Sequence, residues 1–305
     1  MKCARIIYNP TSGREAFKKE LPEVLRRFEE AGFETSTHAT TCEGDATKAA
    51  QYAVERNFDV VVAAGGDGTI NEVINGLAPA ENPPRLGIIP VGTTNDFARA
   101  INVPRHIQKA VSVILEGYVM PIDIGKVNDQ YFVNIAGGGK LTELSYEVPS
   151  KMKTMLGQLA YYLKGIEMIP SFRPTSVRIE YDDNVYEGEI MLFLVSNTNS
   201  VGGFEKLAPD AKMDDGYFDL VIIKKVNIAE LIRLATLAIK GNHLHDHSVL
   251  YAKAQRIKVE TAEKMQLNVD GEYGGLLPGE FVNYYRHIEF FVPEGRWGEE
   301  QDSPL

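Results

Sequence analysis

A glycine-rich turn with one carboxylate is the part of the 305-residue sequence best suited to chemistry. It follows the apolar run of residues 59–64 and reads Gly65-Gly66-Asp67-Gly68-Thr69. A helical pattern over residues 70–77 comes next, so a bulky anion could approach the glycine backbone and meet the unpaired N–H groups of the first helical turn. Phosphate is the ligand such a turn favours, and Asp67 indicates a divalent cation between its carboxylate and the phosphate oxygens. Asn71 stands where a dinucleotide fingerprint needs glycine, and the Walker A pattern is absent, so an ordinary strand-to-helix turn is the alternative.

Two further polar loops follow strand-like runs in the same half of the chain. One follows residues 86–89 and reads Pro90-Val91-Gly92-Thr93-Thr94-Asn95-Asp96. The other follows residues 4–8 and reads Asn9-Pro10-Thr11-Ser12-Gly13, with Arg14 next to it. Because parallel strands end at one edge of a sheet, the three loops are expected to converge and to hold phosphates, a ribose or both. Taken singly, each loop is also typical of a turn or a helix N-cap with Ser and Thr. The donors are main-chain N–H groups and four hydroxyls, those of Thr11, Ser12, Thr69 and Thr93.

The elements that position these loops alternate between strand and helix over the first 120 residues, which predicts a parallel sheet with helical crossovers. Strands are expected at residues 4–8, 59–64 and 86–89, and helices at 17–28, 46–54, 70–77 and 107–115. Gly32 would end the first helix, which contains Pro22.

From residue 123 the pattern becomes mainly antiparallel β. Hairpins are expected where 123–127 and 130–136 flank Asn128-Asp129, and where 176–181 and 185–195 flank residues 182–184. Further strands are expected at 218–224, 256–261, 265–269 and 287–292, with helical inserts at 152–168 and 227–240. Gly137-Gly138-Gly139 indicates a flexible link or close packing, with a phosphate cradle as the alternative.

Composition restricts the function classes. The 32 Lys and Arg residues against 42 Asp and Glu give a formal charge of −10, which argues against nucleic acid as a partner. No apolar run reaches the length of a membrane span, and no signal peptide is recognisable at the start. Cys3 and Cys42 form no CxxC pair, which suits a reducing compartment, so a cytoplasmic protein is predicted. The alternating His243, His245 and His247 would share one face of a strand and hold zinc, but their segment is polar and follows a helix, so the sequence leaves a metal role open.

The glycine-rich motifs resemble the diacylglycerol kinase catalytic family, which includes bacterial lipid kinases and sphingosine kinases. The resemblance is carried by Gly66-Asp67-Gly68-Thr69, Asn71-Glu72-Val73, Asn75-Gly76, Pro90-Val91-Gly92-Thr93 and Asn95-Asp96-Phe97-Ala98. It extends to residues 9–13, 123–125, 212–219 and 269–272, and so covers nearly the whole chain, most closely as in the soluble members of Gram-positive bacteria. NAD kinases share the glycine-aspartate core, but the segment starting at Asn95 is similar to the lipid kinases.

The resemblance implies a fold and a reaction. The fold is α/β plus all-β: a three-layer, Rossmann-like nucleotide-binding domain over residues 1–122, then an antiparallel β-sandwich over 123–289 for lipid and metal. The segment 290–305 would pack back on the first domain, and ATP would bind in the cleft between the domains. The reaction is transfer of the γ-phosphoryl group of ATP to the hydroxyl of diacylglycerol, giving phosphatidic acid. Alternatives are a kinase for sphingosine, another lipid alcohol or NAD, and a non-catalytic nucleotide or lipid sensor of the same fold.

The resemblance also assigns residues. Glu272 would be the catalytic base and Asp67 a second catalytic residue, with Asp270 either orienting Glu272 or acting structurally; without the resemblance, Asp-Gly-Glu is typical of a solvated turn. The nucleotide contacts would be Asn9, Pro10, Thr11, Ser12, Gly13, Thr40, Gly65, Gly66, Asp67, Gly68, Thr69, Glu72, Thr93 and Asn95.

A magnesium ion and a membrane surface complete what the resemblance implies. The side chain of Asp215 and the main-chain carbonyls of Lys212 and Tyr217 would bind Mg²⁺, although Asp-Asp-Gly before a strand is also an ordinary turn. Waters would link the ion to three acidic residues, Asp67, Asp96 and Asp123. Arg14 and Lys164 correspond to membrane-docking positions, which implies transient binding at the inner face of the membrane. A homodimer through the β-rich domain is the family-level expectation.

Overall fold

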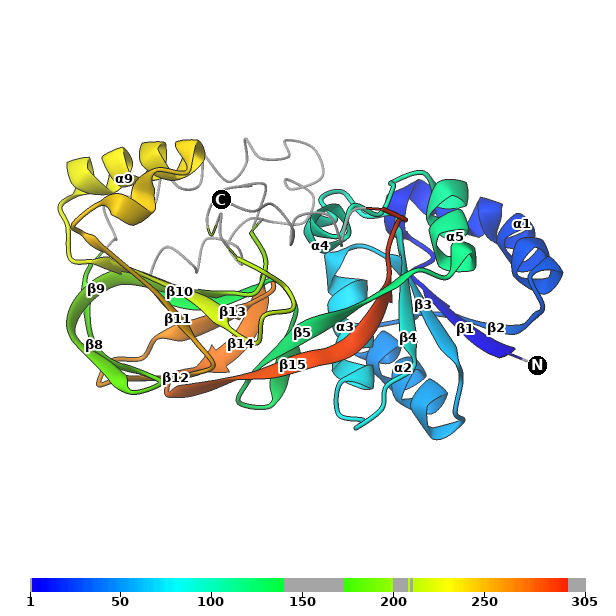
Figure 1. Cartoon of the computed structure of the whole chain (residues 1–305), viewed down its shortest axis with the longest axis horizontal. Helices are drawn as coiled ribbons and strands as arrows, with labels where there is room; N and C mark the ends of the chain where they lie inside the picture. The colour runs from blue at the N-terminus through cyan, green and yellow to red at the C-terminus, as the bar shows by residue number, and fades with distance from the viewer. Residues whose placement is uncertain (1, 140–172, 200–207, 209–210, 296–305) are drawn as a thin grey trace. The chain divides into compact units, whose positions relative to one another are not determined.

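The computed structural model describes residues 2–139, 173–199, 208 and 211–295, and it forms two compact units (Figure 1). The first unit contains Met1–Ile122 and Arg286–Leu305, and the second contains Asp123–Tyr285. Strands β5 (Val119–Val127) and β15 (Gly279–Phe291) carry the chain from one unit into the other. The predicted helix at 152–168, with Lys164, lies outside the described residues. Within those residues, every helix is too short or too polar to cross a membrane.

The first unit is built on a parallel sheet. Its strands lie in the order β2 (Phe33–Ala39), β1 (Lys2–Tyr8), β3 (Val60–Gly65), β4 (Arg85–Pro90) and the end of β15. The three predicted strands are confirmed as β1, β3 and β4, whose apolar runs suit a sheet covered on both faces. Sequence reasoning missed β2, because this edge strand is polar and none of its residues is fully buried.

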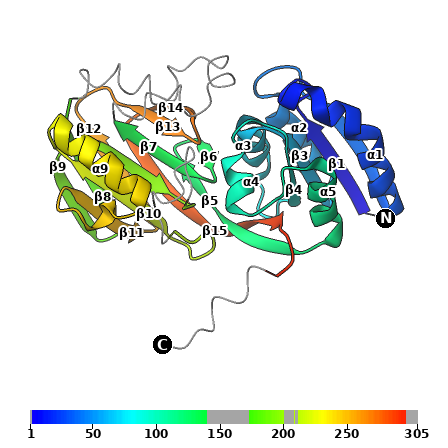
Figure 2. The same cartoon turned by 90° about the horizontal axis from the view of Figure 1, so that it is seen from above.

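Helices cover both faces of this sheet (Figure 2). The helix α1 (Ala16–Glu30) links β1 to β2, whereas α2 (Asp45–Glu55) and α3 (Asp67–Leu77) lie in connections that run across the sheet in the opposite direction, from β2 to β3 and from β3 to β4. Because such crossovers are right-handed, α1 lies on the face opposite α2 and α3. The side chain of Arg27 in α1 donates to the carbonyl of Gln108 in α5 (Ile107–Glu116), so these two helices pack together. The predicted three-layer arrangement is therefore confirmed, with Pro22 inside α1.

Strand order explains why ligand chemistry concentrates at one point. The chain runs from β1 to β2 on one side, and then returns to β3 on the other side of β1. The carboxyl ends of β1 and β3 therefore flank the point where the sheet order reverses, which is where open α/β sheets bind ligands.

The second unit is antiparallel, as predicted. One path of paired strands runs β14 (Glu272–Leu276), β13 (Gln266–Val269), β7 (Ile135–Gly139), β9 (Asn184–Ser196), β8 (Thr175–Tyr181), β12 (Arg256–Thr261) and β15. In its second half β9 also pairs with β10 (Phe218–Lys224), which pairs with β11 (Val249–Ala254). Both predicted hairpins form, and Asn128 and Asp182 adopt positive φ in their turns. The expected strand 130–136 is instead split into β6 (Gln130–Phe132) and β7, and the expected strand 287–292 is the end of the longer β15.

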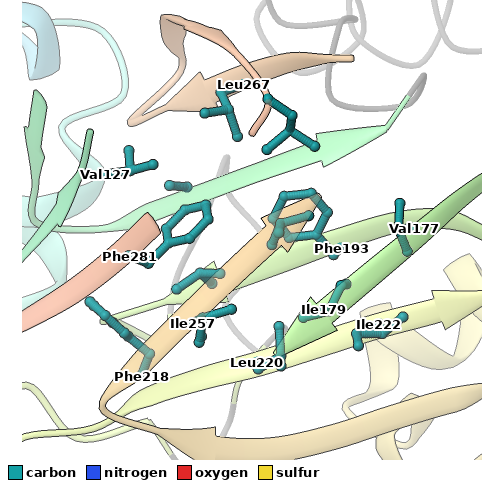
Figure 3. Close-up of a cluster of buried hydrophobic side chains, with 14 of the residues drawn as sticks. Val127, Val177, Ile179, Phe193, Phe218, Leu220, Ile222, Ile257, Leu267 and Phe281 are labelled. Atoms are coloured by element: carbon teal, nitrogen blue, oxygen red, sulfur yellow. The ribbon is translucent and has the colours of Figure 1, made fainter. Parts of the chain in front are cut away.

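A large hydrophobic cluster holds the second unit together (Figure 3). Phe132 stacks on Phe218 with 5.5 Å between ring centroids, and Phe193 meets Phe281 edge-on at 6.0 Å. The triple glycine lies in β7, where a Cβ on Gly137 would come 2.5 Å from the carbonyl oxygen of Phe193. The close-packing interpretation of this segment is therefore confirmed.

One helix and one short turn complete the second unit. The predicted helix is α9 (Ile228–Lys240), which begins with a capping box between Asn227 and Glu230 and ends at Gly241. His243 and His245 follow in the 3-10 turn η3 (His243–His245) rather than on a strand. Across the described residues, no three His, Cys, Asp or Glu side chains are placed to hold a metal ion.

Candidate active site

The three predicted loops of the first unit are in direct contact. The N–H of Asn9, after β1, donates to the carbonyl of Ala64 in β3 at 3.1 Å. The carbonyl of Gly65 accepts from the N–H groups of Val91 and Gly92, after β4, at 3.0 and 3.2 Å. The convergence predicted from the parallel strands is therefore present.

Two glycines are required because the loops pack backbone against backbone. A Cβ on Gly92 would lie 2.5 Å from the Cα of Gly66, and a Cβ on Gly13 would lie 2.5 Å from the carbonyl oxygen of Val91. Gly13 also has a φ of +58°, which favours glycine. Gly68 differs, because a Cβ there would meet nothing within 4 Å. Gly68 therefore leaves open space at the start of α3.

Asp67, the first residue of α3, joins two of the loops. Its carboxylate accepts the N–H of Asn95 and the N–H of Asp96, both at 2.8 Å. Burial raises the pKa of the Asp67 carboxyl, and these two hydrogen bonds oppose that rise. Asp67 therefore has a structural role in the loops, in addition to any contact with a ligand.

Several other predicted nucleotide contacts also have partners within the protein. Asn95 is buried, and its side chain bonds both the N–H and the carbonyl of Gly92 at 3.1 and 2.7 Å. The hydroxyl of Thr11 donates to the Asn9 side chain at 2.8 Å. Glu72 accepts the N–H of Ala46 at 3.0 Å and so ties α3 to α2.

Other predicted residues of this unit lie on or next to the loops. Thr40 follows β2, and its N–H donates to the carbonyl of Tyr8 at 2.9 Å. Asp96 begins α4 (Asp96–Ala100), a short helix that sequence reasoning missed. Arg14 lies in the 3-10 turn η1 (Ser12–Glu15), directly after the first loop.

Some main-chain N–H groups at this edge of the sheet have no protein partner in the described part of the chain and are available to a ligand. No side chain caps α3, and the N–H groups of Gly68 and Thr69 have no acceptor within the described residues. The N–H groups of the exposed Thr93 and Thr94 likewise have none there. Unpaired N–H groups and the positive end of a helix dipole favour an anion such as phosphate.

In the second unit, Asp270 fixes the turn that carries Glu272. Asp270 and Gly271 have φ of +50° and +92° in the two-residue hairpin between β13 and β14. The Asp270 carboxylate accepts the N–H groups of three consecutive residues, each at 2.9 Å: Val133, Asn134 and Ile135. These bonds turn the chain between β6 and β7, which explains why the expected single strand is split.

Glu272, the first residue of β14, is exposed. Its side chain has no hydrogen-bond or ion-pair partner in the part of the chain that the structure describes. A carboxylate without a partner on a fixed turn can accept a proton from a bound hydroxyl.

Asp123 organises the loop 212–217. Its side chain is fully buried and accepts the N–H of Gly216 at 2.7 Å, while its N–H donates to the carbonyl of Met213 at 2.7 Å. The neighbouring carbonyls of Lys212 and Tyr217 accept no hydrogen bond from the described residues. Free oxygen atoms are the ligands that Mg²⁺ prefers, so this loop fits the ion that the sequence predicts.

The third predicted ligand, Asp215, has a cationic partner. One carboxylate oxygen accepts the N–H of Tyr217 at 3.1 Å, and the other contacts the ammonium of Lys253 at 2.7 Å. Each oxygen keeps a second lone pair for a metal ion. Asp215 and Asp123 belong to the second unit, whereas Asp67 and Asp96 belong to the first.

Sequence reasoning missed three residues that shape these loops. Lys253 pairs with Asp215, and the buried Asn197 donates to the carbonyl of Asp123 at 2.7 Å. Arg105 donates to carbonyls of the loop after β4. None of the three lies in a motif with recognisable spacing, so only the position after folding reveals them.

A parallel α/β unit with an N–H-rich edge, followed by an antiparallel β unit, defines a class of two-domain proteins suited to phosphorylated ligands. Residues 3–127 match the family model "Diacylglycerol kinase catalytic domain", and residues 144–290 match "YegS C-terminal NAD kinase beta sandwich-like domain". The chain is 68% identical to the diacylglycerol kinase of Bacillus subtilis strain 168, covering 96% of this chain and 97% of the relative. It is 57% identical to that of Staphylococcus saprophyticus, covering 98% of both. The chain belongs to the diacylglycerol kinase family.

Solved structures agree with this assignment. A crystal structure of a diacylglycerol kinase from Bacillus anthracis strain Sterne aligns with a TM-score of 0.76 at 30% identity, covering 96% of this chain and 97% of that one. Another solved structure from the same organism aligns with a TM-score of 0.83 at 32% identity, covering 96% and 98%. The predicted family and the β-sandwich fold are thus confirmed, and the family implies ATP as phosphoryl donor and a lipid as acceptor.

Proposed function

We propose that this protein transfers the γ-phosphoryl group of ATP to the hydroxyl of diacylglycerol, giving phosphatidic acid and ADP. The observation that carries the proposal is the set of unpaired N–H groups where three loops meet on a parallel sheet. Unpaired N–H groups at such an edge favour an anion such as the phosphate groups of ATP, which supports the proposal. The relatives that cover nearly the whole chain are named diacylglycerol kinases, which supports the choice of acceptor.

In this proposal the residues 1–122 hold the nucleotide. The N–H groups of Gly68, Thr69, Thr93 and Thr94 bind phosphate oxygens, and the nearby hydroxyls add further donors. Asp67 holds the loop after β4 against α3, and so keeps the N–H groups of Thr93 and Thr94 close to those of Gly68 and Thr69. Glu72, Asn95 and Thr11 support the loops through the protein contacts described above.

Glu272 in the segment 123–289 acts as the base. The lipid hydroxyl oxygen forms a bond to the γ-phosphorus as the bond from that phosphorus to the β,γ-bridging oxygen breaks. The hydroxyl proton passes to the Glu272 carboxylate, which later releases it to water. The three hydrogen bonds that the Asp270 carboxylate accepts from main-chain N–H groups hold the turn in place during this step.

The loop 212–217 is the proposed Mg²⁺ site, through the carbonyls of Lys212 and Tyr217 and the side chain of Asp215. When bound, Mg²⁺ supplies positive charge that offsets the charge of the phosphates and of the acidic residues. Asp123 holds the loop through the N–H of Gly216, and the acidic Asp67 and Asp96 are the water-linked partners of the ion in this proposal.

Diacylglycerol resides in a bilayer, so the proposal includes a cytoplasmic protein that contacts the inner face of the membrane transiently. Arg14 and Lys164 are the assigned docking positions, because basic side chains favour anionic lipid surfaces. A homodimer formed through the β-rich residues is also part of this proposal.

The test is a radiolabelled-ATP assay in mixed micelles against diacylglycerol, sphingosine and NAD. We expect diacylglycerol to be phosphorylated and the other two to be poor acceptors. Glu272→Gln should lower turnover by about 10²–10⁴-fold, the usual contribution of a base, while ADP binding persists. Glu263→Gln, in another exposed turn of the second unit, is the matched control. Phosphorylation of sphingosine or NAD but not of diacylglycerol would reassign the substrate. Full activity of Glu272→Gln would show that Glu272 is not the base.

A further inference from the structure

Arg105 lies in the loop after α4 and holds the backbone of the loop after β4. Its guanidinium donates to the carbonyl of Gly92 at 3.2 Å and to the carbonyl of Thr93 at 2.5 Å. Arg105 has no acidic partner within the residues that the structure describes. The guanidinium is therefore directed at main-chain oxygen atoms.

The two carbonyls determine where two N–H groups point. In a trans peptide the C=O and the N–H of the same unit point in opposite directions. The carbonyl of Gly92 shares its peptide with the N–H of Thr93, and the carbonyl of Thr93 shares its peptide with the N–H of Thr94. Because Arg105 holds both carbonyls, it turns both N–H groups away from itself, and both lack an acceptor within the described residues.

The next peptide, between Thr94 and Asn95, is held in the same way: an arginine binds its carbonyl, and its N–H points at an anionic group. Arg99 donates to the carbonyl of Thr94 at 3.1 Å, and the N–H of that peptide, on Asn95, donates to the carboxylate of Asp67 at 2.8 Å. In this peptide, the Asp67 carboxylate is the anionic group that accepts the N–H. A bound phosphate would occupy the equivalent place beside Thr93 and Thr94.

We propose that Arg105 is a positioning residue for ATP, which holds the N–H groups of Thr93 and Thr94 toward the nucleotide phosphates. The proposal rests on the proposed function and adds a residue to its nucleotide site. Arg105 acts on the carbonyl side of the loop, so it touches the peptide and not the phosphate. Its positive charge also polarises both peptides, which strengthens their N–H groups as donors.

Kinetics with three variants provide the first test. Arg105→Ala should raise the KM for ATP about tenfold, the size of one lost hydrogen bond, while kcat changes less than about threefold. Arg105→Lys should retain most of the affinity, because an ammonium still donates to carbonyls, and Arg105→Gln should be intermediate. Arg85→Ala is the matched control, because Arg85 is exposed in the same unit and pairs with Glu289. An unchanged KM in Arg105→Ala, or a loss of kcat alone, would overturn the proposal.

Amide spectra of the full chain provide a readout that a purely structural role would not move. In the wild type, adding ADP should shift the ¹⁵N–¹H signals of Thr93 and Thr94 and protect both from exchange. In Arg105→Ala these two responses should shrink, whereas the responses of Gly68 and Thr69 should persist. The reverse pattern would contradict the proposal. If the wild type phosphorylates no lipid alcohol, the proposed function fails, but the ADP response still decides the role of Arg105.

Discussion

The two units prepare opposite kinds of surface for binding. In the first unit, the carboxylate of Asp67 and the carbonyl of Gly65 accept hydrogen bonds from within the protein, so the groups left over are N–H donors. In the second unit, the side chains of Asp123 and Asp270 accept main-chain N–H groups. The groups that remain without a protein partner among the described residues are oxygen atoms, those of the Lys212 and Tyr217 carbonyls and of the Glu272 carboxylate. Donors attract an anion, whereas oxygen atoms attract a cation or a proton. A kinase needs both kinds of group.

Backbone geometry explains the difference. Parallel strands bring three loops and one helix N-terminus to a single edge, and a helix N-terminus always has spare N–H groups. An antiparallel hairpin instead presents a tight turn at positive φ, a position that Asp adopts with little strain. Asp182 and Asp270 both occupy such turns, and both accept main-chain N–H groups from a neighbouring segment.

Among the changes that test this comparison between the two units, the largest effect is expected from Asp67→Ala. The change leaves the N–H groups of Asn95 and Asp96 without acceptors and separates the loop after β4 from α3, so activity should fall by about a hundredfold or more. Nucleotide binding, measured by calorimetry with ADP, should weaken in parallel. Asp59→Ala is the control, because Asp59 accepts the N–H of Cys3 at the opposite end of β3. Wild-type activity in Asp67→Ala would show that the two loops do not depend on this carboxylate.

A smaller effect on catalysis is expected from Asp270→Ala in the second unit. Three N–H groups lose their acceptor, so the free energy of unfolding should fall by about 2–4 kcal/mol, and kcat should fall about tenfold as the turn of Glu272 loosens. Asp182→Ala is a matched control, since Asp182 holds the equivalent N–H groups of Gln255 and Arg256. Urea unfolding and steady-state kinetics separate the two cases. Equal loss of kcat in both variants would show that Asp270 has no special relation to Glu272.

The location of the sites could be predicted from the sequence, but most partners within them could not. The rule that parallel strands end at one edge was sufficient to bring together the loops at Asn9, Gly66 and Gly92. Nothing in the sequence indicates that Glu72 reaches the N–H of Ala46 or that Arg105 reaches the carbonyl of Thr93. Such pairings depend on how distant segments pack.

The strands show the same division between local and distant information. Strand β3 was predictable because its residues are uniformly apolar, whereas β2 is an edge strand whose Thr and Ser residues give no clear pattern. The break between β6 and β7 arises from Asp270, which lies more than 130 residues later in the chain. The local pattern of residues 130–136 therefore could not reveal it.

A moderate effect on metal binding is expected from Lys253→Met. The ammonium lies 2.7 Å from the Asp215 carboxylate, and both side chains are partly buried, at 35% and 22% exposure, so its charge should oppose a metal ion at the same carboxylate. Its removal should lower the Mg²⁺ concentration for half-maximal activity by about 3–10-fold. The shift of thermal unfolding with Mg²⁺, recorded without ATP, is an independent measurement.

The control for this change is Lys225→Met. Lys225 contacts Glu189 at the same 2.7 Å distance on an exposed part of the second unit, and its removal should leave the Mg²⁺ dependence unchanged. A higher Mg²⁺ requirement in Lys253→Met would mean that the lysine supports the proposed Mg²⁺ site in the loop 212–217 instead of competing with the ion.

The smallest effect is a pair of opposite pH trends in the two units. Burial raises the pKa of Asp67, whereas the N–H of Ser248 and then the guanidinium of Arg233 lower the pKa of Asp246. A raised pKa means that the folded state binds the proton more tightly, so the stabilising contribution of Asp67 falls as the pH rises above the usual carboxyl value of about 3.9. The contribution of Asp246 is complete above that value and is lost as the pH falls through its lowered pKa. In urea unfolding between pH 3 and pH 7, the loss of unfolding free energy caused by Asp67→Ala should therefore shrink as the pH rises. The loss caused by Asp246→Ala should grow over the same range. Trends of equal sign would contradict the contrast between the two carboxylates.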